Sequence, residues 1–291
     1  MGMGLYHASA AARSVFDAAD AVLGFPLTKI IFDGPTEELR QTVNAQPAIY
    51  CVSIACLRAM EEQLGDAMPT PAFVAGHSLG EHTALAAAGA LTFADGLRLV
   101  RRRGELMQAA IDRVPSGMAA MLGAALETVQ DVCAATGAQV ANLNSPGQYV
   151  IAGPLAVLDE AVALAQERGV RRVVRLEVSG AFHTEMMRPA QDELDVALRD
   201  VELHHAAVPI VANTIARPVT TPEEVRQELA QQLCGCVLWQ ASVEYMVAQG
   251  VTRFVEVGPG NVLTGLARRI APEVEAVAVE GLDAMAGLTI N

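Results

Sequence analysis

Aromatic residues, positive charge and long apolar runs are all in short supply in this sequence. Only 4% of its 291 residues are Phe, Trp or Tyr, so the core must be aliphatic and built largely from Ala, Val and Leu. No stretch of about 18 residues is both apolar and uncharged, and we therefore expect no membrane span. Residues 1–16 lack the basic start and continuous apolar stretch of a signal peptide. The net charge of −13 argues against a nucleic-acid binder, which would need a basic face to neutralise phosphates.

Cysteine is infrequent as well. Five cysteines are few and odd in number, which suits reduced thiols, so we expect a cytoplasmic protein. The close pair Cys234 and Cys236 has no second pair and no neighbouring histidine, which favours ordinary buried thiols over a metal or redox site. Hydrophobic residues make up 52% of the chain and charged residues 18%, as is typical of a soluble globular enzyme.

Strand-like and helix-like segments alternate along the chain, which predicts an α/β protein. Residues 71–75 have the apolar pattern of a short buried strand, and helices are expected next at 81–91 and 93–110. Towards the end, a strand at 254–257, a Gly-Pro-Gly turn and a helix at 262–270 repeat this pattern.

The middle of the chain has its own order of elements. Strands are expected at 118–123, 138–142, 149–152 and 172–178, and helices at 126–136 and 155–168. This β-α-β-β-α-β order is that of the ferredoxin-like split unit. We therefore expect a small domain at residues 117–178, inserted into a larger α/β domain made of residues 1–116 and 179–291.

The segment Gly76-His77-Ser78-Leu79-Gly80 matches the G-x-S-x-G pattern of a nucleophile elbow. An apolar strand leads into it and a helix follows, as such an elbow requires. We expect both glycines to be needed, because a side chain on either flank of the tight turn would clash. The turn would place the Leu79 amide at a helix N-terminus, ready to meet a developing oxyanion. The alternative is a serine that only caps the helix.

A nucleophilic serine needs a base, and the chain offers six histidines. His183 lies in a loop after an expected strand, a position typical of catalytic residues in open α/β sheets. His82 lies one helical turn beyond Ser78 and is a rival. His77 should point away from the cleft, and His204 and His205 lie where a strand is expected to begin. On spacing alone, a structural histidine remains an alternative to a base at position 183.

The segment from Gly76 to Glu81 resembles the GHSxGE signature of malonyl-CoA:ACP transacylases and polyketide acyltransferase domains. Further landmarks of that family follow in order: Arg101-Arg102-Arg103-Gly104, Asn142-Leu143-Asn144-Ser145-Pro146-Gly147-Gln148, Ala181-Phe182-His183, Gln231-Gln232-Leu233 and Val257-Gly258-Pro259-Gly260. Chance is a poor explanation for so many landmarks in the right order.

This resemblance implies an α/β fold with a large α/β-hydrolase-like domain and an inserted ferredoxin-like subdomain. It implies transfer of a malonyl group from malonyl-CoA to an acyl carrier protein, with Ser78 as nucleophile, His183 as base and the Leu79 amide facing the substrate. No metal and no cofactor are implied, and neither a nucleic acid nor a membrane is an expected partner.

The resemblance also implies roles for three other residues. Arg103 would hold the malonyl carboxylate through a two-pronged ion pair, although spacing alone does not choose it over its neighbours. The family orients its histidine through a backbone carbonyl, which aligns with Gln232. Phe182 resembles the bulky residue that favours malonyl over branched malonyl groups. Asn144 is expected to form a turn.

The chain departs from the family at its start. The family begins with a strand and a GQGxQ loop whose glutamine supplies part of the oxyanion hole. This chain opens at Met1-Gly2-Met3-Gly4-Leu5, which resembles the segment just after that loop. The expectation is therefore that the first strand and its glutamine are missing, through an internal start or a real loss that impairs the enzyme.

Two other functions stay open at this point. A serine esterase or thioesterase of the α/β-hydrolase type would place an acidic residue between serine and histidine, and would carry an HGGG-like loop. The last histidine here is His205, far from the end of the chain, and the sequence contains no such loop. A catalytically impaired protein that binds a carrier protein is the second alternative, and the missing first strand makes it plausible.

Overall fold

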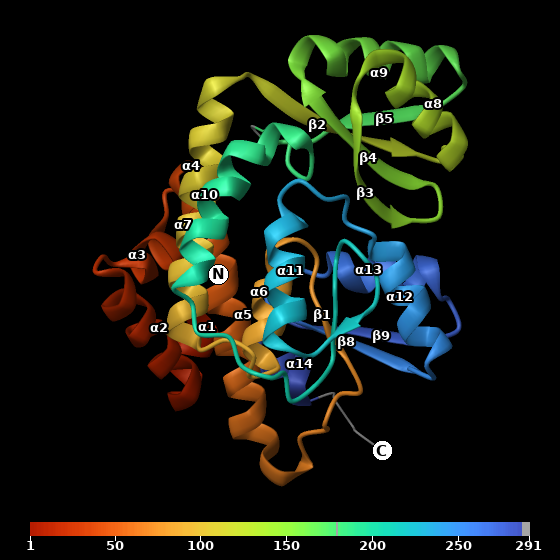
Figure 1. The fold of residues 1–291 in the computed structure, drawn as a ribbon. Coiled ribbons are helices and arrows are strands. Elements are labelled where there is room, and N and C mark those ends of the chain that lie inside the picture. The colour runs from red at the N-terminus through yellow and green to blue at the C-terminus, as the bar shows by residue number, and fades with distance from the viewer. Residues whose placement is uncertain (179, 287–291) are drawn as a thin grey trace.

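The computed structural model describes residues 1–178 and 180–286, which form an α/β fold of helices packed around and beside small sheets (Figure 1). Within these residues, no helix combines the length and the apolar character needed to cross a membrane.

Residues 1–70, to which the sequence analysis assigned no elements, are mainly helical. The helices of this segment are α1 (Met3–Ala8), α2 (Ala10–Leu23), α3 (Leu27–Asp33), α4 (Thr36–Arg40) and α5 (Thr42–Leu64). Helix α5 packs against α2 and α7, and most of its residues are buried. Its Tyr50 ring stacks on Phe93, the first residue of α7. The long helix α5 therefore forms the centre of the aliphatic core.

Two small sheets lie among the helices. In one, β1 (Val74–Ala75) runs parallel to β6 (Ile210–Val211), and β6 pairs antiparallel with β7 (Pro218–Val219). In the other, β8 (Arg253–Val257) runs parallel to β9 (Glu275–Val279). The helices that accompany these strands are α6 (Leu79–Ala87), α7 (Phe93–Arg113), α10 (Arg188–Arg199), α11 (Pro222–Gln232), α12 (Trp239–Ala248), α13 (Val262–Ile270) and α14 (Leu282–Ala286).

A four-stranded antiparallel sheet lies between α7 and α10 in the sequence, at the top of Figure 1. Its strands have the spatial order β3-β4-β2-β5. The elements are β2 (Ser116–Leu122), α8 (Leu126–Thr136), β3 (Gln139–Ser145), β4 (Gln148–Pro154), α9 (Leu155–Glu167) and β5 (Arg172–Arg175). Both helices pack on this sheet, and Val129, Ile151 and Leu158 are buried in the core they share with it.

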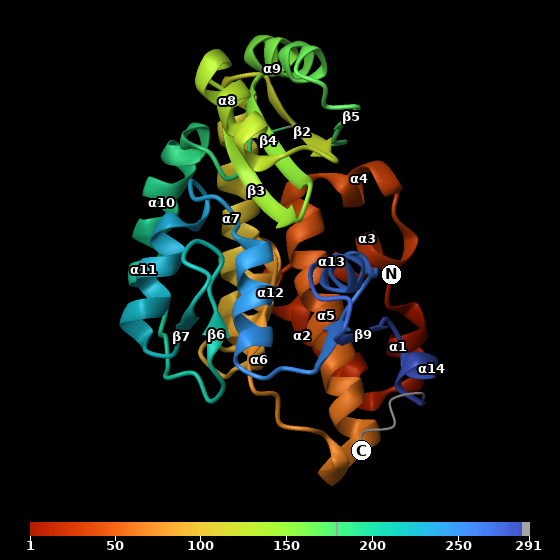
Figure 2. The ribbon, with the colours of Figure 1, turned by 90° about the vertical axis from the view of Figure 1, so that its right-hand side faces the viewer.

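The β3–β4 end of this sheet contacts the rest of the molecule, as the view in Figure 2 shows. The Leu143 N–H donates to Val237 O at 2.9 Å, and the Val237 N–H donates to Ala141 O at 2.9 Å. His77 Nε2 and Asn144 Oδ1 lie 2.9 Å apart. The sheet therefore contacts the rest of the molecule at His77, the residue that precedes Ser78.

Most of the expected elements are present, with shifted ends. The strand expected at 71–75 is reduced to Val74–Ala75, because the chain turns at Gly76 and only two residues pair with β6. Asn144 belongs to β3 and not to a turn, because the strand continues to Ser145, which pairs with Gln148 of β4. His204 and His205 were expected at the start of a strand, but they lie in an irregular segment before β6.

Candidate active site

Ser78 stands on a sharp turn between β1 and α6. Its backbone has φ 52° and ψ −107°, a conformation that non-glycine residues rarely adopt and that is strained. A Cβ on Gly76 would come within 2.0 Å of the Gly80 backbone, so glycine is required there. A Cβ on Gly80 would meet no atom within 4 Å. The expectation that both glycines are sterically required is therefore wrong for Gly80.

The His183 ring lies between Ser78 and two backbone carbonyls. His183 Nε2 is 2.7 Å from Ser78 Oγ. His183 Nδ1 is 2.9 Å from Gln232 O and 3.2 Å from Gly235 O. Because a carbonyl oxygen can only accept, Nδ1 carries the proton and Nε2 presents its lone pair to the serine hydroxyl. The contact to Ser78 Oγ thus comes from His183 and not from its rival His82.

Burial keeps His183 unprotonated. Its side chain is only 4% exposed, and this burial is the main cause that lowers the pKa of His183 to about 3. The charge of Arg103 and the proximity of His77 lower it further, against the hydrogen bonds to Gln232 O and Gly235 O. The imidazole is therefore neutral at pH 7 and able to take a proton from Ser78.

Arg103 is the member of the arginine triplet that faces Ser78. It is 1% exposed, and its Nη2 donates to Ser78 Oγ at 3.1 Å and to Gln232 Oε1 at 3.0 Å. Its Nη1 donates to Gln46 Oε1 at 2.6 Å. Burial lowers the pKa of Arg103 to about 10, whereas the nearby Glu81 raises it, so the guanidinium stays charged at neutral pH.

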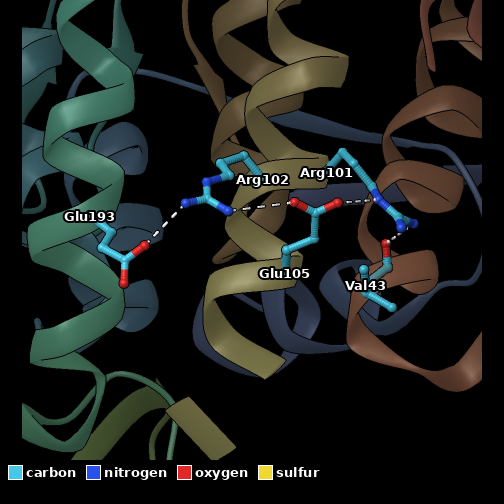
Figure 3. Close-up of polar contacts among 5 residues, drawn as sticks. All are labelled: Val43, Arg101, Arg102, Glu105 and Glu193. Atoms are coloured by element: carbon cyan, nitrogen blue, oxygen red, sulfur yellow. Dashed lines mark hydrogen bonds and ion pairs between the residues drawn. The ribbon is translucent and has the colours of Figure 1, made fainter. Parts of the chain in front are cut away.

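The two preceding arginines point elsewhere (Figure 3). Arg101 donates from Nε to Glu105 at 2.9 Å and from Nη1 to Val43 O at 3.1 Å. Arg102 pairs with Glu105 at 3.7 Å and with Glu193 of α10 at 3.0 Å. Both arginines therefore tie neighbouring helices together at the surface.

The remaining expected residues also lie around this group. Leu79 is the first residue of α6, so its N–H has no acceptor within the helix and stays next to Ser78. Phe182 is half-buried and packs against two apolar clusters, one on the four-stranded sheet and one among the helices. The Gln232 side chain adds a contact that sequence reasoning missed, because its Nε2 donates to Ser78 O at 2.9 Å.

Sequence reasoning also missed three buried polar residues of the site: Gln46, Glu81 and Asn213. Gln46 holds Arg103, and Glu81 accepts from the backbone N–H of Asn213 at 2.9 Å. Burial, and then the nearby Glu228 carboxyl, raise the pKa of Glu81 well above its usual range. Glu81 could have been singled out, since it ends the segment that matches the family signature.

The buried histidines predict that the protein loses stability in mild acid. Burial is the main cause that lowers the pKa of His82 and of His183 to about 3. An unfolded histidine titrates near about 6.5, so between these values the unfolded chain binds protons that the folded chain does not. The free energy of unfolding is therefore unaffected by these groups above pH ~6.5 and falls as the pH drops towards ~3.

A His82→Leu variant should show this effect in urea unfolding. Removing one such histidine should reduce the stability lost between pH ~7.5 and ~5 by about 2 kcal/mol. The exposed His7 offers a matched control, and His7→Gln should leave that loss as it is in the wild type. An equal loss of stability with falling pH in the wild type and in His82→Leu would contradict the lowered pKa of His82.

The chain belongs to the acyltransferase family. Residues 1–282 match the sequence model of the acyl transferase domain. A curated malonyl CoA-acyl carrier protein transacylase of Bacillus subtilis is 43% identical over 284 residues, which cover 96% of this chain and 88% of that protein.

Solved structures agree in fold. An acyl-carrier-protein S-malonyltransferase from Bartonella henselae superposes with a TM-score of 0.93 at 40% identity, covering 98% of this chain and 92% of that one. A malonyl-transacylase in complex with its type II PKS acyl-carrier protein superposes with a TM-score of 0.94 at 36% identity, covering 98% of this chain and 93% of that one.

Proposed function

We propose that this chain transfers a malonyl group from malonyl-CoA to the phosphopantetheine thiol of an acyl carrier protein, through an ester on Ser78. The observation that carries the proposal is the position of Ser78 Oγ, 2.7 Å from His183 Nε2 and 3.1 Å from Arg103 Nη2. The His183 imidazole and the Arg103 guanidinium thus both contact the Ser78 hydroxyl. A positive charge at this position suits an acyl group that carries a free carboxylate.

Each half-reaction moves one proton through His183. Ser78 Oγ attacks the thioester carbon while its proton passes to His183 Nε2, and the Leu79 N–H faces the oxyanion. The coenzyme A thiolate leaves and takes the proton from the imidazolium. The carrier thiol then gives its proton to His183 and attacks the ester, and Ser78 regains a proton as it leaves.

Arg103 is proposed to recognise the free carboxylate of the malonyl group. Its Nη2 already points to Ser78, and its buried Nε has no acceptor in the part of the chain that the structure describes. Nε and Nη2 lie on one edge of the guanidinium, the edge that a carboxylate can bind with both oxygens. An acyl group without the carboxylate would leave these donors unpaired.

The finer architecture is part of this proposal. We propose a ferredoxin-like small domain at residues 117–178, inserted into an α/β-hydrolase-like domain of residues 1–116 and 179–291. The order β3-β4-β2-β5 and the antiparallel pairing support the first, because they are those of the split β-α-β unit. The strand–elbow–helix path through Ser78 supports the second.

We further propose that Phe182 limits the size of the acyl group, as its half-buried position beside His183 supports. A cytoplasmic location is proposed as well. It is supported by the cysteines, all five of which are free thiols.

A trapped acyl-enzyme tests the function directly. Incubation with malonyl-CoA should add one malonyl mass to the peptide that contains Ser78, and Ser78→Ala should take up none. Addition of an acyl carrier protein should remove the mass from Ser78 and place it on the carrier. Sustained release of free malonate in place of transfer would identify a hydrolase, and a malonyl mass that persists in Ser78→Ala would refute the nucleophile.

A further inference from the structure

Asn213 lies directly behind the turn that carries Ser78. It follows β6, the strand that runs parallel to β1, and its side chain is 1% exposed. Asn213 Oδ1 accepts from the Ser78 N–H at 2.7 Å, and Asn213 Nδ2 donates to Gly76 O at 2.8 Å. One side-chain amide therefore grips the backbone on both sides of His77.

These two contacts take the place of two backbone hydrogen bonds between β1 and β6. In the β1–β6 ladder, Val74 pairs with Ile210 and the Val74 N–H donates to Pro209 O at 3.0 Å. If the ladder continued, the backbone N–H of Asn213 would donate to Gly76 O, and its backbone C=O would accept from the Ser78 N–H. The side-chain amide makes both bonds instead, with its own N–H and C=O.

Because the side chain of Asn213 makes these two hydrogen bonds, its backbone is free to bind other partners. Its N–H donates to Glu81 Oε1 at 2.9 Å, and its C=O accepts from the Leu238 N–H at 2.8 Å. Glu81 lies on α6, the helix that starts just after Ser78, and it also accepts from the Gln232 side chain. Strand, turn and helix are thus fixed to one another through Asn213.

We propose that Asn213 is a positioning residue that holds the strained backbone of Ser78, and so keeps Oγ within reach of His183 Nε2. This inference rests on the proposed acylation of Ser78. The Ser78 backbone, at φ 52°, is strained, and releasing its N–H would remove one of the contacts that hold it there, while the Gln232 contact to Ser78 O would remain. Because the Ser78 N–H is bound to Asn213, the Leu79 N–H is the one left to face the oxyanion.

Only a group that donates and accepts at once can do this. Asparagine meets the requirement, and so does a protonated aspartic acid, whereas an ionised aspartate has no donor and would place a carboxylate oxygen against the Gly76 carbonyl oxygen. In the Asn213→Asp variant, the new carboxyl group should therefore hold the Ser78 backbone in place when it is protonated and should release it when it is ionised. The charged or titratable groups around the Ser78 turn and Asn213 are Glu81 from α6, Glu228 from α11, Arg103 from α7, the half-buried His77 and the buried His183.

The experiment measures the rate at which malonyl-CoA acylates Ser78, together with the dissociation constant for free coenzyme A. Asn213→Ala should slow acylation by on the order of 100-fold, because a shift of about 1 Å at the nucleophile has an effect of that size, and leave coenzyme A binding unchanged. Between pH ~5 and ~9, the rate of Asn213→Asp relative to the wild type should fall as the carboxyl ionises. That relative rate should stay constant for Asn213→Ala.

Asn44→Ala is the matched control, since Asn44 is also buried and its Nδ2 donates to Glu38 O at 2.9 Å, away from Ser78. It should lose stability in urea but acylate at the wild-type rate. Wild-type acylation in Asn213→Ala, or a relative rate of Asn213→Asp that does not change with pH, would overturn the inference.

A second reagent separates this inference from the proposed function. Phenylmethylsulfonyl fluoride reacts with activated serines whatever their natural acyl donor, and Asn213→Ala should slow this reaction as well. A wild type that reacts with the fluoride but takes no malonyl mass would refute the proposed substrate alone. Equal fluoride reaction in wild type and Asn213→Ala would refute the positioning role alone.

Discussion

Replacing His183 by Ala should slow the acylation of Ser78 by about two to four orders of magnitude, the usual contribution of a general base. His183 Nε2, the proposed base, lies 2.7 Å from Ser78 Oγ, and Gln232 O accepts from the Nδ1 of the same ring. The malonyl mass on Ser78, followed against time after mixing with malonyl-CoA, gives the rate. Coenzyme A binding should be nearly that of the wild type, because the proposed role of the imidazole is proton transfer and not substrate binding.

His205→Ala is the control for this variant, since His205 is exposed and outside the site. It should acylate at the wild-type rate. Wild-type acylation by His183→Ala would reject the base and direct attention to His82, which is buried on α6 just beyond the nucleophile.

Arg103→Ala should change which acyl group is transferred. Removing one partner of a buried charge pair costs about 2–5 kcal/mol, which corresponds to about 30- to 4000-fold in rate. Malonyl transfer should fall by this factor, and acetyl transfer by much less, because acetyl has no carboxylate. The ratio of the two transfer rates is the measurement, since it cancels any general damage from the lost contact to Ser78.

Two further variants sharpen this prediction. Arg103→Lys keeps the charge without the planar two-pronged edge, so its ratio should lie between those of wild type and Arg103→Ala. Arg102→Ala should leave the ratio unchanged, because Arg102 pairs with Glu105 and Glu193 at the surface. An equal fall of malonyl and acetyl transfer in Arg103→Ala would show that Arg103 is structural.

The choice among the arginines shows what a sequence can and cannot decide. Three consecutive residues on a helix point in directions about 100° apart, so the three arginines cannot all face the same way. Spacing from Ser78 does not reveal which one. The apolar residues of α7 do not decide it either, because Val100 and Met107 flank Arg103 at the same helical intervals at which Leu99 and Leu106 flank Arg102, and all four are buried. Only the contacts of Arg103 to Ser78 and Gln232 in the folded chain distinguish it from Arg102.

Asn213 and Gln46 illustrate the opposite case. The α/β class and the elements at 71–178 and 254–270 were largely predictable, because their apolar periodicity is local, whereas the helices between 179 and 253 were not assigned. Gln46 lies in a region to which no pattern assigned an element, and Asn213 acquires its contacts from a neighbouring parallel strand. A partner 135 residues away in the chain leaves no local trace. Long-range pairing of this kind becomes visible only once the strands are placed side by side.

The separations along the chain also bear on how the site comes into being. Ser78 is 105 residues from His183, and Gln232 is 129 residues from Arg103 and 154 from Ser78. Closing loops of this length is entropically costly, so such contacts form late in folding. In a growing or half-folded chain, Ser78 is not yet in contact with His183 and Gln232, and Gln232 is not yet in contact with Arg103. Reactivity of Ser78, the proposed nucleophile, towards an acyl donor should therefore appear only after folding has brought these residues together.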